Sequence, residues 1–206
     1  MIDGVPQSTP LRNGSLGVKT IDPSALARIE VIKGATSVYG NGASGGIINY
    51  ITKQATTQDS HKGQISLSSR FSAVKTEESA GARVSAAVNG KTGNFDYLLT
   101  ASYEENGVQR DAEGDILGLQ YGLSDAETQN YFTKLGYEFD DEKRLQFSYN
   151  YFSSQQKTDL GDVAGDINQG EKSYAIHVPE ALQKQGKPQG PDGNENITVK
   201  YTDSNI

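Results

Sequence analysis

Apolar and polar side chains alternate along five stretches of the chain. The stretches cover residues 63–71, 82–88, 95–104, 130–139 and 145–152. Successive side chains of a strand point to opposite faces of a sheet, so this period of two predicts five β-strands, each with one apolar and one polar face. A sixth strand is expected to begin at residues 196–201. With the residues that flank each alternating stretch, strands of roughly nine to eleven residues are expected, the length that a tilted strand needs to cross a bilayer.

The connections between these stretches differ in length. Residues 89–93 and 140–144 form short turns, whereas residues 106–125 and 154–195 form long polar loops. Short turns at one end and long loops at the other, with Tyr and Phe near the strand ends, are typical of outer-membrane β-barrels. The alternative is a soluble antiparallel sandwich with one wet face. A loop of about forty residues without obvious structure is uncommon in a compact soluble domain, which favours the barrel.

A glycine-rich segment, Ile21–Lys53, precedes the alternating strands. Asp22 followed by Pro23 predicts a helix N-cap and one short turn of helix. A strand is expected at Arg28–Lys33 and another at Ile47–Thr52, with glycines at positions 34, 40, 42, 45 and 46 in and around the turn between them. Glycines at such a turn allow positive φ angles and close backbone packing.

Composition and charge narrow the class of protein. Only 34% of the residues are apolar, 23 are glycine and none is cysteine. Disulfides, cysteine zinc sites and thiol nucleophiles are therefore excluded. No apolar run is long enough for a transmembrane helix, and the first residues lack the pattern of a signal peptide. Residues 1–62 carry a net charge of +2 and residues 63–206 one of −9. The acidic second part argues against nucleic-acid binding, which requires a basic face.

Two motifs suggest ligand chemistry, and both are incomplete. Gly40–Gly45 matches the G-x-G-x-x-G pattern, but a dinucleotide fingerprint needs a helix after it, and Ile47–Thr52 is strand-like. Asp111, Glu113 and Asp115 alternate as in a calcium loop. They lack the central glycine and the final glutamate of that loop, so a solvated loop tip is expected.

The remaining candidate residues do not form a catalytic or metal pattern. His61 and His177 are isolated in the sequence, without a second histidine at metal-ligand spacing. Asp159, Asp162 and Asp166 are interpreted as solvated charge in a long loop. No G-x-S-x-G motif is present. No enzyme is expected, and no catalytic, cofactor-binding or metal-binding residue is assigned.

The glycine-rich segment resembles a known family signature. Residues 27–37 (ARIEVIKGATS) and 39–53 (YGNGASGGIINYITK) resemble the plug domain of TonB-dependent outer-membrane receptors, and residues 2–6 (IDGVP) resemble the segment that precedes it. Ala27 departs from the acidic residue that the family often has there. The resemblance covers some fifty residues in the family's order.

This resemblance implies a mainly β fold in two parts. Residues 1–57 would be the C-terminal part of a plug domain, and residues 58–206 the first five to six antiparallel strands of a 22-stranded transmembrane β-barrel. The chain is thus expected to be a truncated receptor. The signal peptide, the TonB-contacting segment, the first part of the plug and the later strands would be missing.

The resemblance also implies roles for individual residues. Arg28, Glu30 and Lys33 match positions that face the barrel wall, where they would pair with inward charges. Other residues would shape the plug rather than contact ligand: Gly34, Tyr39, Gly40, Gly45, Gly46 and Asn49. Residues 35–43 and 154–195 are the candidate ligand-facing regions.

The function implied is uptake of a ferric siderophore across the bacterial outer membrane, with energy delivered by TonB. The expected partners are TonB, the ferric siderophore and outer-membrane lipid, with no nucleic acid and no resident cofactor. Gly34-Ala35-Thr36 stands where cobalamin receptors usually have Gly-Pro, which favours the siderophore branch, including aerobactin-type hydroxamate receptors. Alternatives are a receptor for cobalamin, haem or a glycan and, in another class, a non-transporting surface β-protein or adhesin.

Overall fold

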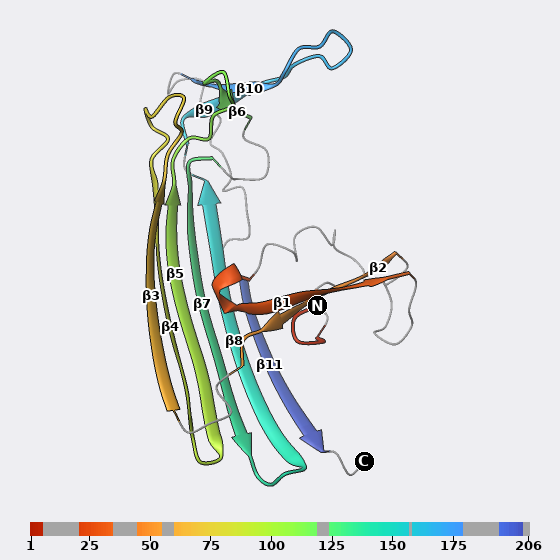
Figure 1. Ribbon diagram of the computed structural model, residues 1–206. Helices are drawn as coiled ribbons and strands as arrows, with labels where there is room; N and C mark the ends of the chain where they lie inside the picture. The colour runs from red at the N-terminus through yellow and green to blue at the C-terminus, as the bar shows by residue number, and fades with distance from the viewer. Residues whose placement is uncertain are drawn as a thin grey trace.

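The largest unit of the protein is a six-stranded antiparallel sheet (Figure 1). The computed structural model describes residues 1–5, 21–34, 45–54, 60–118, 124–156, 158–178 and 194–203. The sheet consists of β3 (Ser60–Arg70), β4 (Gly81–Thr92), β5 (Phe95–Asn106), β7 (Ala126–Glu138), β8 (Lys143–Gln156) and β11 (Asn194–Asp203). Their order is β11-β8-β7-β5-β4-β3, so the strands follow one another as neighbours along the chain. The prediction of five to six antiparallel strands is confirmed.

A separate hairpin lies against one face of this sheet, hereafter the inner face (Figure 1). It is formed by β1 (Leu26–Lys33) and β2 (Gly46–Thr52), which pair antiparallel. A single 3-10 turn, η2 (Pro23–Ala25), precedes it, and the Asp22 side chain accepts a hydrogen bond from the Ser24 amide at 2.7 Å. The predicted turn and both predicted strands are therefore confirmed to within about two residues. The expected boundary after residue 57 lies outside the described residues.

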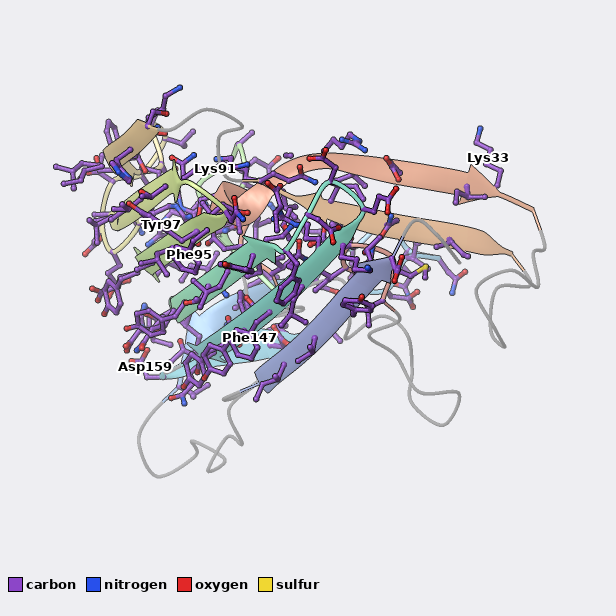
Figure 2. All side chains as sticks on the ribbon, turned by 90° about the horizontal axis from the view of Figure 1, so that it is seen from below. Lys33, Lys91, Phe95, Tyr97, Phe147 and Asp159 are labelled. Carbon is purple, nitrogen blue, oxygen red and sulfur yellow. The ribbon has the colours of Figure 1, made fainter. Side chains whose placement is uncertain are left out.

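In a soluble sandwich the apolar face of a sheet is buried and the polar face is exposed, and in this sheet the opposite holds. Large apolar side chains of the outer face, the face away from the hairpin, are exposed, as at Ile65 (76%) and Leu67 (79%). Figure 2 shows Phe95, Tyr97 and Phe147 on the side of the sheet away from the hairpin. Polar inner-face side chains are buried instead: Asp96, Thr100, Ser102, Asn130, Lys134 and Asn150. A sheet that is apolar outside and polar inside matches a barrel wall facing lipid, not a soluble core.

The strand lengths also suit a membrane. The six strands contain between 10 and 14 residues. A tilted transmembrane strand needs about 9 to 11. Among the described residues no helix is long and apolar enough to cross a membrane, a finding that has no bearing on strands.

A second, small sheet lies beyond one end of the six strands (Figure 1). It joins β6 (Ile116–Leu117), β10 (Tyr174–His177) and β9 (Leu160–Val163) in that order. Four buried apolar residues form its core: Val108, Ile116, Leu160 and Ala175. The expectation of long loops without obvious structure is wrong for these residues. Strands of two to four residues are too short to give a periodic pattern in the sequence.

Candidate functional site

Two polar clusters join the hairpin segment to the inner face of the sheet. The first surrounds Asp22, whose side chain is only 3% exposed. Arg83 of β4 donates from Nη2 to both carboxylate oxygens of Asp22, at 2.7 and 2.9 Å. The Ser102 hydroxyl of β5 donates to Asp22 Oδ2 at 2.8 Å. With the Ser24 amide, every donor that Asp22 contacts is directed at its ionised form, so the carboxylate is satisfied although it is buried.

The Asp22 cluster continues across the sheet as an ion-pair network. Arg83 also donates from Nη1 to Glu104 Oε2 at 2.9 Å, and Arg70 of β3 donates to Glu104 Oε1 at 2.9 Å. Asp22, Arg83, Glu104 and Arg70 therefore alternate in charge from the hairpin segment to the edge strand. Arg83 and Glu104 thus each lie between two opposite charges, which offsets part of the desolvation cost of their partial burial.

Burial and hydrogen bonding act in opposite directions on Asp22. Burial would raise the pKa of its carboxyl, but the hydrogen bonds from Arg83, Ser24 and Ser102 outweigh burial, and the pKa is lowered. Asp22 is therefore ionised at neutral pH, and its interaction with the sheet is that of a carboxylate.

The second cluster surrounds Asp3 and Lys134. Thr52 donates to Asp3 from its amide at 2.9 Å and from its hydroxyl at 2.6 Å. Lys134 of β7, whose side chain is 6% exposed, places Nζ 3.0 Å from Asp3 Oδ2 and 2.8 Å from the Thr52 hydroxyl oxygen. Burial would raise the pKa of Asp3, and the bonds from Thr52 and Lys134 lower it overall. This cluster attaches both the first residues and the end of β2 to the sheet.

A small apolar contact lies between the hairpin segment and β5 and β7. It contains Ile21, Ala25 and Tyr50 from the hairpin side and Leu98 and Phe132 from the sheet. Leu98 and Phe132 are each 2% exposed. The hairpin covers both residues, and Phe152 is a further buried apolar residue on this mostly polar face. Among the described residues the contact consists of five buried side chains and the partly buried Ile2 and Leu26. It is small, so we expect the polar clusters to contribute to the attachment as well.

The residues predicted to face the wall lie elsewhere on the hairpin. Arg28 Nε pairs with Glu30 Oε1 of the same strand at 2.8 Å, with the two side chains 64% and 40% exposed. Asn49 donates to Glu30 at 3.3 Å and accepts from the Gly4 amide at 3.0 Å. Figure 2 shows Lys33 at the end of β1 that points away from the six strands. Their contact with a barrel wall stays a prediction, because other residues make the hairpin–sheet ion pairs observed here.

The predicted turn glycines differ in what the backbone demands of them. Gly34 has a φ angle of +92° and Gly46 one of +124°. Residues other than glycine rarely adopt such angles. A Cβ at Gly46 would lie 2.5 Å from the Ile32 carbonyl oxygen, whereas one at Gly45 would meet no atom within 4 Å. Tyr39 and Gly40 lie outside the described residues, as does the candidate ligand-facing range 35–43.

Several charged loop residues, interpreted from the sequence as solvated, form ion pairs with other residues. Asp111 and Asp115 lie 2.7 and 2.8 Å from Lys172 Nζ, and Glu113 also contacts it. The three carboxylates are close enough together to hold a cation, and the Lys172 ammonium occupies that position. Glu113 and Asp115 are more than half exposed, as expected of a loop tip, but the expectation did not include their ion pairs with Lys172. Asp159 is likewise half exposed and contacts His177 at 3.1 Å. The partners are distant in sequence, so no local spacing reveals them.

A half-open groove of about 690 Å³ lies between the hairpin and the inner face of β3, β4 and β5. Its charged lining residues are Lys53 and Lys62, with amides from Gln54, Gln64 and Asn89 beside them. No acidic residue lines it among the described residues. The volume is within the usual range for ligand cavities, and the lining suits an anionic solute.

Comparison with known proteins identifies the fold. Residues 1–47 match the family described as TonB-dependent Receptor Plug Domain. The ferric aerobactin receptor of Klebsiella pneumoniae is 32% identical over 99% of this chain, and the rhizobactin receptor of Rhizobium meliloti is 30% identical over all of it. The chain belongs to the TonB-dependent receptors. The hairpin is then part of the plug and the six strands are part of the barrel wall, in the bacterial outer membrane.

A solved structure supports the same assignment. The ferric enterobactin receptor of Pseudomonas aeruginosa in complex with enterobactin superposes with a TM-score of 0.51 and 26% identity. The match covers 66% of this chain and 21% of that one. The chain spans 28% of the length of the curated aerobactin and rhizobactin receptors. The plug–wall clusters around Asp22 and Lys134 are therefore features of one portion of a receptor of this family.

Proposed function

We propose that this sequence is part of an outer-membrane receptor that takes up a ferric siderophore of the aerobactin or related hydroxamate class. The observation that carries the proposal is similarity along the whole chain to ferric aerobactin and rhizobactin receptors, not only along the plug. The matched region extends well beyond residues 1–47, which match the plug family, and includes the barrel strands. The iron chelate is cargo, and no resident cofactor or catalytic step is proposed.

The polar attachment of the plug supports an uptake role. A plug held to the wall by Asp22–Arg83 and Asp3–Lys134, with a small apolar contact, can separate from it without exposing a large hydrophobic surface. We propose that TonB supplies the work for this separation through a segment near the plug N-terminus. The groove beside Lys53 and Lys62 has the size and charge for an anionic chelate to pass along the wall.

The proposal is tested by uptake in a strain of the bacterium that carries this sequence. Deleting the receptor gene is expected to abolish accumulation of ⁵⁵Fe from ferric aerobactin under iron limitation, and plasmid-borne wild type should restore it. Accumulation should stop when an uncoupler collapses the proton gradient of the inner membrane, since TonB depends on it. Ferric enterobactin, haemin and cobalamin are measured in parallel.

The parallel ligands separate the alternatives. Unchanged uptake of ferric aerobactin together with lost uptake of haemin would identify a haem receptor instead of a siderophore receptor. This alternative is tested because a haemin receptor of Yersinia pestis is 30% identical over 75% of this chain. Loss of enterobactin uptake alone would change the siderophore class. Normal uptake of all four with reduced surface adhesion would indicate a non-transporting surface protein.

A further inference from the structure

His177 lies between two carboxylates that come from different outer segments. Its Nδ1 is 3.1 Å from both oxygens of Asp159, which precedes β9. Its Nε2 is 2.9 Å from Glu78 Oε2, in the connection between β3 and β4. His177 itself ends β10. One imidazole therefore joins the β3–β4 connection to the small outer sheet.

The geometry requires a particular protonation state. A neutral imidazole has one N–H donor and one lone pair, so it can satisfy only one of two carboxylates. With an acceptor at each ring nitrogen, the second contact becomes attractive only when both nitrogens carry a proton. The observed arrangement is thus that of an imidazolium between two carboxylates, and deprotonation would leave one carboxylate facing a lone pair.

Glu78 is fixed in position by its own backbone. It has φ +57°, which non-glycine residues rarely adopt. Its carbonyl accepts from the Val108 amide at 2.7 Å, and a Cβ at Gly107 would lie 2.4 Å from the same oxygen. Ser79, next in sequence, is buried and bonds back to the Thr76 carbonyl at 2.9 Å. The carboxylate is therefore presented to His177 by a rigid turn.

Two further charged groups among the described residues lie near this contact. Arg110 Nη2 is 3.7 Å from Glu78 Oε2, the same oxygen that His177 contacts. Asp162 lies further along the same β9–β10 ladder, paired with Ala175, while His177 pairs with Leu160. In the described part of the chain, Asp159 and Glu78 are thus the carboxylates in contact with the ring, and Arg110 shares Glu78 with it.

We propose that His177, Glu78 and Asp159 form a proton-operated clasp that fastens the outer connections at acidic pH and releases them as the pH rises. Hydrogen bonds that the His177 ring donates to the carboxylates of Asp159 and Glu78 raise the pKa of His177 above its usual value of 6.5. For a raised pKa, the contribution to stability is complete below the ordinary value and is lost as pH rises through the raised one. The clasp would operate whatever ligand the receptor carries.

The clasp is tested by hydrogen–deuterium exchange of the receptor in detergent at pH 5.5 and pH 8.5, with labelling times scaled to the intrinsic exchange rates. Peptides covering residues 72–80 and 158–178 are expected to be protected about fivefold more at pH 5.5, the scale of two half-exposed ion pairs. His177→Gln should abolish this pH dependence. His61→Gln should retain it, because the His61 ring contacts the hydroxyls of Tyr97 and Thr92 rather than carboxylates.

A second variant keeps the test decisive if His177→Gln folds poorly. Asp159→Asn leaves the imidazole in place and removes one acceptor, so the pH midpoint of protection should move lower. Heat-modifiable migration on gels verifies that each variant has a closed barrel. An unchanged midpoint in Asp159→Asn, or equal protection at both pH values in wild type, would overturn the proposal. Neither outcome bears on siderophore uptake, which is assayed separately.

Discussion

Replacing Asp22 by Asn tests whether the polar clusters hold the plug to the wall. Asn has nearly the same shape and remains a good N-cap, so η2 keeps its cap. The change removes the negative charge that Arg83 contacts at 2.7 and 2.9 Å. The Asn side chain keeps one acceptor oxygen, and its NH2 group becomes a donor that faces the donors of Arg83, Ser24 or Ser102.

The size of the effect follows from the surroundings of Arg83. Removing one partner of a fully buried ion pair costs about 3–5 kcal/mol. The Arg83 side chain is 23% exposed and keeps Glu104 at 2.9 Å, so part of its charge stays compensated. We expect a loss of about 2–3 kcal/mol in the free energy that holds the hairpin segment to the sheet. Since about 1.4 kcal/mol is a factor of ten, local opening should increase about 30- to 140-fold.

Native-state hydrogen exchange of the purified receptor measures this opening. The Lys53 amide, bonded to the Ala25 carbonyl at 2.8 Å, reports on the junction of η2 and β2. Glu30→Gln is the matched control, because the Arg28–Glu30 pair is exposed and should change exchange by less than about threefold. If Asp22→Asn exchanges no faster than Glu30→Gln, the polar clusters do not hold the plug, and the apolar contact must do so.

Three further predictions concern the hairpin and its attachment to the wall. The pKa values of Asp3 and Asp22 are lowered, so the stability that these carboxylates contribute is complete above about pH 4 and is lost as the pH falls below it. The difference in melting temperature between wild type and Asp22→Asn, measured by circular dichroism, should therefore become smaller from pH 6 to pH 3. A constant difference would contradict this. Gly46→Ala should lower hairpin stability by at least about 1–3 kcal/mol in denaturant titrations while Gly45→Ala changes it little, and equal effects would refute the steric explanation. Lys134→Met should increase protease cleavage near the first residues by weakening attachment by about 1–3 kcal/mol, and unchanged cleavage would exclude a role for that lysine.

The wall strands and the hairpin are predictable from the sequence because their signals are local. Alternation over about ten residues marks each strand and also identifies which face is apolar, and Asp22-Pro23 marks the turn before β1. The resemblance to the plug signature depends on contiguous residues in the same way. These features need no knowledge of which distant segments meet.

The plug–wall clusters are not predictable in this way. Asp22 is identified only as an N-cap, and its partners Arg83 and Ser102 lie 61 and 80 residues away. Lys134 lies 131 residues from Asp3. In the sequence, an inner-face arginine that will bind the plug cannot be distinguished from an inner-face arginine that will face water. Because Asp is itself a favoured N-cap residue, its presence before Pro23 gives no sign of a second role.

The outer loops escape prediction for a different reason. β6, β9 and β10 contain only two to four residues each, and their core is assembled from both long connections. The signal lies in the pairing of distant segments, not in a repeating pattern. His177 likewise appears isolated until folding brings Asp159 and Glu78 to its two nitrogens.

The polar inner face has a thermodynamic consequence for plug movement. Heat-capacity changes arise mainly from the hydration of apolar surface. Moving the hairpin off the wall uncovers chiefly Leu98 and Phe132 on the sheet, together with charged and hydroxyl groups that water solvates readily. The enthalpy of plug detachment should therefore vary little with temperature, unlike the unfolding enthalpy of a soluble domain of the same size. The free energy needed to move the plug should then change linearly with temperature, without the curved maximum that a large heat-capacity change gives the stability of a soluble domain.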